Sequence, residues 1–215
     1  NSIVVPPLID LMADKWNFST SNVNQNFEKT INLVYAGNPG LKDKLDQILQ
    51  AIAIFNQGNH LKKVYLHFFG VEKEVLQNLV SIDIFDSSND FLIFNDRVNQ
   101  EQVPEKLNSY DFSIFLRPPK KYAMAGFPTK FVESLGAGCP VITNYTSDLD
   151  LYLKNGFNGF VVKALNIESI LEVFNTLDLL SLDELYEMKK NAYQTAKREF
   201  DFPNLENQFK QLLEQ

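Results

Sequence analysis

The sequence predicts an α/β fold built on a doubly wound parallel sheet with helices on both faces. Three observations lead to this prediction. Strand-like and helix-like segments alternate between residues 31 and 162. The strand-like segments are short hydrophobic runs, as expected for strands buried on both faces of a parallel sheet. Several of them end beside a glycine or a proline, where the chain can turn towards the next helix. Parallel strands of this kind are joined by right-handed helical crossovers.

Six segments rich in β-branched and aromatic residues predict the strands. They are residues 31–36, 64–69, 91–94, 112–116, 140–144 and 160–162. Hydrophobic residues at helical spacing predict the helices between and after them. These cover residues 41–57, 71–79 and 103–109, a segment beginning near Thr129, and the chain from residue 167 to its end. Lys120 and Lys121 are expected in a solvated loop.

The beginning of the chain lacks this alternation. A β-branched run at residues 3–5 is stopped by Pro6 and Pro7, and residues 10–30 are polar with no sustained period, so we expect a long loop with one helical turn near residues 11–13. The prediction is therefore an interdomain linker at residues 1–30, followed by one domain at residues 31–215.

Composition limits the possible partners. The 215 residues are 45% hydrophobic, enough for a packed core, and 27 acidic against 20 basic residues give a formal charge of −7. This charge repels nucleic acid and anionic membranes at long range, so a polyanionic ligand requires a local basic cluster. The single cysteine, Cys139, excludes an intramolecular disulfide and indicates a reducing cytoplasm. With no initiator Met and no membrane-spanning run, we expect a fragment of a cytoplasmic protein.

The candidate ligand site follows the fourth predicted strand, because ligands of such sheets bind beyond the carboxyl ends of the strands. Thr129 is expected to cap a helix whose first N–H groups favour an anion. Arg117 and Lys130 add positive charge at the same place. Glu133, one turn into the helix, can accept hydrogen bonds from a vicinal diol such as a ribose. Glycines at positions 136 and 138 are expected to end the helix.

This segment resembles the hallmark of the GT-B glycosyltransferases known as glycosyl transferases group 1. The shared pattern is Glu-x-x-x-x-Gly-x-Pro-Val-Ile, which begins here at Glu133 and ends at Ile142. Two further segments are similar to family motifs and occur in the family's order: residues 35–37 with Lys42, and the Asn-Gly-Phe-Asn-Gly-Phe turn at residues 155–160. Residues 4–7 resemble the family's interdomain linker. The resemblance covers roughly the whole chain.

The resemblance implies a Rossmann-like C-terminal domain of a retaining enzyme that binds a nucleoside-diphosphate sugar. The diphosphate would rest on the loop from Gly37 to Lys42 and on the start of the helix at Thr129, the ribose on Glu133, and the base near Arg97 and Val98. The complete set of expected contacts is Gly37, Lys42, Arg97, Val98, Arg117, Phe127, Thr129, Lys130 and Glu133. The family implies no cofactor and no metal.

The acceptor side, and any general base, would belong to a domain absent from this chain. The catalytic residues are therefore unknown, and the chain alone is expected to bind donor without transferring it. No nucleic-acid partner is expected, and association with a membrane would occur only through the missing half. The acceptor would be a saccharide or a lipid-linked molecule.

Two departures from the family pattern affect the expected contacts. The second family Glu, eight residues before Glu133, is Ala125, which removes a carboxylate contact to the donor sugar. The family arginine after the first glycine is Asn38, which removes a diphosphate contact that Arg117 would replace. The Phe-Pro-Thr-Lys segment resembles a subgroup acting in surface-polysaccharide assembly.

Two alternative functions fit the predicted fold. A nucleotide-sugar epimerase or hydrolase would need its own acid–base pair, and the sequence shows no convincing pair. A non-catalytic, flavodoxin-like regulatory domain would need an acidic pocket at a strand end. Asp148-Leu149-Asp150 resembles a metal-binding Asp-x-Asp, but acids at a helix start are explained by the helix dipole. His67 is interpreted as a packed strand residue, and Lys42 also fits an ordinary surface charge cluster.

Overall fold

The computed structural model describes residues 5–16, 24–39, 43–204 and 206. This part of the chain forms a six-stranded sheet in the order β3-β2-β1-β4-β5-β6, in which every neighbouring pair is parallel. The strands are β1 (Thr30–Ala36), β2 (Lys63–Phe69), β3 (Leu92–Asn95), β4 (Phe112–Ile114), β5 (Val141–Thr143) and β6 (Gly159–Val161). The predicted fold is thus confirmed. The strand order reverses between β1 and β4, which is where ligands of doubly wound sheets bind.

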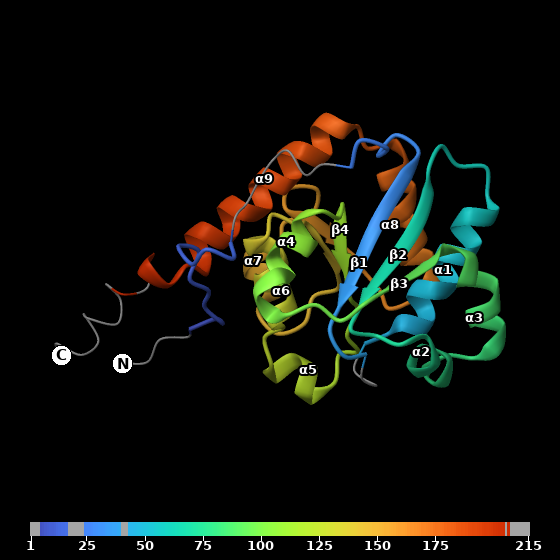
Figure 1. The fold of residues 1–215 in the computed structure, drawn as a ribbon, viewed down its shortest axis with the longest axis horizontal. Helices are drawn as coiled ribbons and strands as arrows, with labels where there is room; N and C mark the ends of the chain where they lie inside the picture. The colour runs from blue at the N-terminus through green and yellow to red at the C-terminus, as the bar shows by residue number, and fades with distance from the viewer. Residues whose placement is uncertain (1–4, 17–23, 40–42, 205, 207–215) are drawn as a thin grey trace.

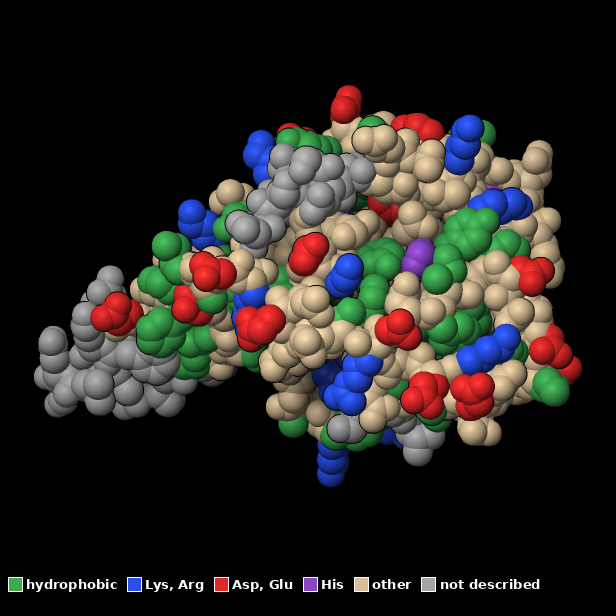
Figure 2. Space-filling model, viewed as in Figure 1, with side chains coloured by type: hydrophobic (Ala, Val, Ile, Leu, Met, Phe, Trp, Pro, Cys, Tyr) green, Lys and Arg blue, Asp and Glu red, His purple; other side chains and the backbone are tan. Residues whose placement is uncertain are grey.

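Helices cover both faces of the sheet (Figure 1). On one face lie α1 (Leu45–Gln57), α3 (Ile82–Ser88) and α8 (Ile167–Leu179), and on the other lie α4 (Val103–Asn108), α6 (Thr129–Gly136) and α9 (Leu182–Glu199). The shorter helices are α2 (Lys73–Leu79), α5 (Lys121–Ala125) and α7 (Leu149–Tyr152), with 3-10 turns η1 (Asn89–Phe91) and η2 (Gln100–Gln102). No helix of the described residues is both long and apolar enough to span a bilayer. Acidic and basic side chains are interspersed over the face of the molecule shown in Figure 2.

The element boundaries differ from the prediction where the local signal is short. Helix α1 begins at Leu45 rather than at residue 41, and α3 was not predicted. Lys121 begins α5, so its assignment to a loop is wrong. Helices of five to seven residues such as α5 and α3 contain too few turns for a period to emerge. The C-terminal helical region divides at Ser181, whose side chain forms a capping box with Glu184 and starts α9.

The segment before the first described strand packs against the end of α9. Ile9 donates its backbone N–H to the Phe200 carbonyl at 2.9 Å and accepts from the Phe202 N–H at 2.9 Å. The Leu11 N–H donates to the Asp201 carboxylate at 3.0 Å, and Trp16 is buried. Residues 11–15 form turns rather than a helical turn. Residues 1–4 lie outside the described part, so a linker to a second domain stays a prediction.

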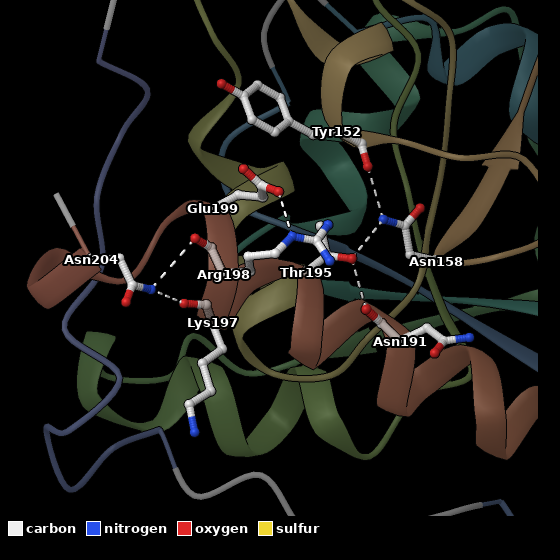
Figure 3. Close-up of polar contacts among 8 residues, drawn as sticks. All are labelled: Tyr152, Asn158, Asn191, Thr195, Lys197, Arg198, Glu199 and Asn204. Carbon is white, nitrogen blue, oxygen red and sulfur yellow. Dashed lines mark hydrogen bonds and ion pairs between the residues drawn. The ribbon is translucent and has the colours of Figure 1, made fainter.

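The turn at residues 155–160 attaches β6 to the rest of the fold (Figure 3). The Asn158 side chain is buried, accepts from the Lys154 N–H at 2.9 Å, and donates to the Tyr152 carbonyl at 2.9 Å and the Thr195 hydroxyl at 3.1 Å. A β-carbon on Gly159 would lie 2.1 Å from the Val141 carbonyl oxygen, so only glycine allows β6 to approach β5 this closely. This family-like motif therefore has a structural role, because it joins β5, β6 and α9.

Candidate functional site

Three adjoining cavities lie at the carboxyl edge of the sheet, the second and third of them where the strand order reverses, and together we call them the switch-point cleft. The first cavity, about 370 Å³, lies between the loops that follow β1, β2 and β3. The second, about 270 Å³, lies between the β1 loop, α4, α6 and Trp16. The third, about 420 Å³, lies between the loops after β1 and β4 and the start of α6. Gly37 borders the first two cavities, and Thr129 and Lys130 border the second and third.

The start of α6 faces this cleft, as the sequence predicts. Thr129 is the first residue of the helix and lines the second and third cavities. Its expected role as N-cap is wrong, because the extended Pro128 occupies that position and no side chain makes a capping hydrogen bond. The Pro128 carbonyl instead accepts the Phe131 N–H at 3.0 Å. The first N–H groups of a helix lack partners within the helix, so this end favours an anion.

Lys130 belongs to a charged cluster that includes Asp43 and Tyr35. The Lys130 ammonium lies 2.9 Å from an Asp43 carboxylate oxygen and 3.8 Å from the centre of the Tyr35 ring. The Tyr35 hydroxyl donates a hydrogen bond to the same carboxylate oxygen. Burial lowers the pKa of Lys130, and the Asp43 carboxylate opposes this effect. Burial also raises the pKa of Tyr35 well above its ordinary value, with Asp43 adding to the shift.

Asp43 and Tyr35 were not predicted as part of the site. The Asp43 side chain is only 8% exposed, although the residue lies between two lysines in a glycine-containing loop and looks like part of a solvated charge cluster. Its one distinguishing signal in the sequence is its position shortly after the first strand, on the edge of the sheet where ligands bind. Lys42, which was predicted to contact phosphate, lies outside the described residues.

Arg117 extends from the end of β4 towards the third cavity, which it lines. Its backbone is fixed by Asn144, which accepts the Arg117 N–H at 2.9 Å and donates to the Arg117 carbonyl at 2.9 Å. Its guanidinium donates to the Gly126 carbonyl at 2.9 Å and so spans the loop that leads to α6. Arg117 and Lys130 therefore border the same cavity, as the sequence predicts.

Glu133 lines the second cavity together with Lys15, Trp16 and Gln100. It lies one helical turn after Thr129, so both residues face the cleft. Burial raises the pKa of Glu133 above its ordinary value, while the nearby Lys130 and Lys15 oppose the shift. Glu133 thus borders the cleft, and its contact with a ribose stays a prediction.

The remaining candidates occupy different parts of the cleft. Phe127 lines the third cavity and packs against the rings of Phe131 and Tyr152, at centroid distances of 6.1 and 5.6 Å. Arg97 and Val98 line the first cavity, which Glu133 does not border. Arg97 and Val98 therefore border a different cavity from Glu133. The two cavities meet at Gly37 and at the start of α4.

Two residues outside the cleft match their interpretation from the sequence. His67 is packed in β2, with its ring 4.7 Å from that of Tyr110, and burial lowers its pKa to about 4, so the ring is neutral at physiological pH. Asp148 directly precedes α7, as expected for an acid at a helix start. The described residues contain no group of three or more His, Cys, Asp or Glu side chains placed to hold a metal ion.

The family model for glycosyl transferases group 1 matches residues 18–198. The chain belongs to this family. No curated protein matches this glycosyltransferase chain significantly by sequence. Similar solved structures include Anabaena Alr3699/HepE in complex with UDP and glucose, with a TM-score of 0.69 and 15% identity over 96% of this chain and 55% of that one.

Two other solved structures are similar over nearly the whole chain. The pneumococcal O-GlcNAc transferase GtfA in complex with UDP and GlcNAc has a TM-score of 0.63 and 16% identity, over 98% of this chain and 38% of that one. The N-terminal domain of Candida albicans trehalose-6-phosphate phosphatase has a TM-score of 0.68 and 14% identity, over 97% of this chain and 48% of that one. At these identities the likeness shows the fold alone. The glycosyltransferase chain spans between 38% and 55% of the length of these three structures.

Proposed function

We propose that this chain is the C-terminal, donor-binding domain of a retaining GT-B glycosyltransferase and that it binds a nucleoside-diphosphate sugar in the switch-point cleft. One observation carries the proposal: Glu133 and Lys130, three residues apart on α6, border the same cavity. This places the Glu133 carboxylate about one helical turn from the Lys130 ammonium. The carboxylate can accept hydrogen bonds from two hydroxyls, and the ammonium can bind a phosphate. In a nucleotide, the ribose hydroxyls and the phosphates are separated by a similarly short distance.

The roles proposed for the other residues follow from their cavities. The diphosphate would extend from the start of α6 into the third cavity, between Lys130 and Arg117. The ribose would lie in the second cavity beside Glu133, and the base would continue past the start of α4 towards Arg97 and Val98. Gly37 would lie beside the start of the diphosphate, because it borders the second cavity and a β-carbon on it would lie 3.4 Å from Lys130 Cε. Phe127 would form a wall of the third cavity.

This arrangement would assist transfer through electrostatics. When the bond between the sugar and the diphosphate breaks, negative charge develops on the terminal phosphate. Cations and helix N–H groups held in place before the reaction stabilise such charge without reorganising. Lys130, Arg117 and the start of α6 are such groups. The acceptor, and any base that receives its proton, would be contributed by a second domain.

The comparisons support the choice of the first ligand to test. Two of the similar structures were solved with UDP, so a uridine nucleotide is the first candidate donor for this chain. The proposed acceptor is a saccharide or a lipid-linked molecule on the cytoplasmic side, and the proposed pathway is surface-polysaccharide or glycan biosynthesis. No specific observation favours an epimerase, a hydrolase or a regulatory domain, and the two cations of the third cavity differ from the acidic pocket that a flavodoxin-like regulator requires.

A titration series of uridine, UMP, UDP and UDP-glucose tests the proposal. We expect calorimetry to show the affinity increasing from uridine to UMP and again to UDP, because each phosphate adds a contact to the cationic part of the cleft. A nucleotide at a hundredfold its Kd should stabilise the fold by about 2.7 kcal/mol. GDP and ADP are included because the base is not fixed by the residues present. Absence of binding by all three nucleoside diphosphates at millimolar concentration would refute the proposal.

A further inference from the structure

The cavity proposed to receive the diphosphate contains a fixed negative charge. Asp43 lines the third cavity with Lys130 and Arg117, so two cations and one carboxylate surround the same space. The carboxylate is not a mobile surface acid, because its side chain is 8% exposed and is held by the Lys130 ammonium at 2.9 Å and by the Tyr35 hydroxyl. A carboxylate in such a position weakens anion binding, so its presence there requires an explanation.

We propose that Asp43 makes the cleft discriminate against a free nucleoside diphosphate in favour of the nucleotide sugar. This inference rests on the proposed function. In the nucleotide sugar each phosphate carries one negative charge. During transfer the bond between the sugar carbon and the terminal phosphate oxygen breaks, and the electron pair stays on that oxygen. The sugar carbon bonds to the acceptor oxygen, whose proton passes to a base that the second domain would contribute. The released diphosphate thus carries one more negative charge, which Asp43 repels.

The geometry gives the size of the effect. A phosphate oxygen bound to the Lys130 ammonium would lie about 2.8 Å from it. The Asp43 oxygen lies 2.9 Å from the same nitrogen, so the two oxygens are at most about 6 Å apart. At this separation, with an effective dielectric constant of about 20 to 40, one additional charge weakens binding by roughly ten- to hundredfold. Asp43 is therefore a specificity-determining residue that promotes product release.

The same repulsion acts on the charge that develops during transfer. Asp43 would therefore reduce the electrostatic assistance of Lys130 and Arg117 while it weakens product binding. Its contact with Lys130 also fixes the position of the ammonium, which affects the nucleotide sugar and the free diphosphate alike. The ratio of the affinity for the free diphosphate to that for the nucleotide sugar separates these effects. A change in the position of Lys130 alters both affinities, so its effect largely cancels in the ratio.

The test is the ratio of UDP affinity to UDP-glucose affinity, measured by calorimetry at pH 8, with inorganic diphosphate as a ligand that lacks base and ribose. Asp43→Asn keeps the shape and removes the charge. We expect the ratio to rise roughly tenfold in this variant, and inorganic diphosphate to bind roughly tenfold more tightly. Asp46→Asn makes the same change in net charge in the first turn of α1, away from the three cavities, and should leave the ratio unchanged.

Tyr35→Phe removes the hydrogen bond to Asp43 but keeps the carboxylate, so the ratio should also stay unchanged. If Asp43→Asn does not fold, as judged by its thermal transition, Asp43→Ser supplies a second neutral side chain for the same measurement. An unchanged or lowered ratio in the neutral variants would overturn the role of Asp43 and leave the donor site in place. A wild-type protein that binds neither UDP nor inorganic diphosphate would instead overturn the proposed function, and this inference with it.

Discussion

The side chain of Lys130 passes over the backbone of Gly37. A β-carbon built on Gly37 would lie 3.4 Å from Lys130 Cε, and Gly37 has a φ of 106°, a conformation that side-chain-bearing residues rarely adopt. The turn after β1 and the start of α6 thus meet at Gly37. The backbone conformation there favours glycine, and the Lys130 side chain lies against it. This contact joins the two segments that would hold a diphosphate.

Gly37→Ala should destabilise the fold and weaken nucleotide binding. The positive φ imposes a strain of about 1–3 kcal/mol on alanine, which urea unfolding would measure. The added methyl group also reaches the first two cavities beside Lys130, so we expect the affinity for UDP to fall at least about threefold. Gly156→Ala is the control, since Gly156 also has a positive φ, of 76°, but borders none of the three cavities. It should lose stability without losing affinity; equal losses of affinity in both variants would contradict the role of Gly37.

Glu133→Gln should lower the affinity for UDP without lowering stability. The amide keeps the shape but accepts hydrogen bonds from the ribose less strongly, at a cost of about 1.5–3 kcal/mol, or roughly ten- to hundredfold in Kd. Burial raises the pKa of Glu133, which means that its ionised form is disfavoured in the folded state. Removing the charge should therefore maintain or increase the free energy of unfolding at pH 7. Unchanged affinity, measured by calorimetry beside a wild type that binds, would show that Glu133 is not a ribose ligand.

Lys130→Met should destabilise the protein more when Asp43 is present than when it is replaced in the Asp43→Asn background. Without the ammonium, the Asp43 carboxylate loses its cationic partner at a site where its side chain is 8% exposed. We expect a loss of about 1–3 kcal/mol in the wild-type background and under about 1 kcal/mol in the neutral one. Urea unfolding of the four proteins gives the coupling energy.

The exposed ion pair between Lys163 and Glu172 provides the comparison for this cycle. Its side chains are 80% and 65% exposed, so Lys163→Met should change stability by less than about 0.5 kcal/mol. A coupling energy near zero between Lys130 and Asp43 would mean that their contact, like that of the exposed pair, is dispensable for the fold.

Asp111 should make stability depend on pH between about 4 and 6. Burial raises its pKa from 3.8 to about 6, although its carboxylate accepts the Asn32 N–H at 2.6 Å and the Asn24 amide at 3.0 Å. Because the folded-state pKa is raised, the stabilising contribution is fully present below the unfolded-state pKa and is lost as the pH rises through about 6.

Asp111→Asn removes this titration and can retain both hydrogen bonds through its carbonyl oxygen. Between pH 4 and pH 7 the wild type should therefore lose about 2–3 kcal/mol relative to the variant. Urea unfolding at both pH values measures the difference, in which the other titrating groups cancel. Parallel pH profiles for the two proteins would show that Asp111 has an ordinary pKa.

The sequence was sufficient to predict the parallel sheet, the positions of its six strands along the chain, and the position of α6. These features depend on local patterns. The run at residues 112–116 is hydrophobic except for Ser113, as expected for a strand buried on both faces, and the entire run is buried in the structure. The side of α6 on which Glu133 lies could also be predicted from local sequence, since helical geometry places it on the same side of the helix as Thr129.

Other features were decided only by tertiary structure. The family-like turn at residues 155–160 was identified from the sequence, but its function in the fold depends on the hydrogen bond between Asn158 and Thr195, which is 37 residues away along the chain. The cap of α6 also differed from the prediction, because Pro128 and Thr129 are both compatible with a helix start and the structure has Pro128 as the N-cap. Short-range patterns do not contain this information.

The most consequential tertiary feature is the pairing of Asp43 with Lys130. The two residues are 87 positions apart, and each is surrounded in the sequence by charges or turn residues that explain it equally well as a surface residue. They meet because β1 and β4 are adjacent, so the loop after β1 and the segment that leads from β4 to α6 emerge on the same edge of the sheet. The sequence by itself determined that Arg117 and Lys130 would form a cationic site at this edge. Only the adjacency of β1 and β4 in the folded sheet decided that Asp43 would share it.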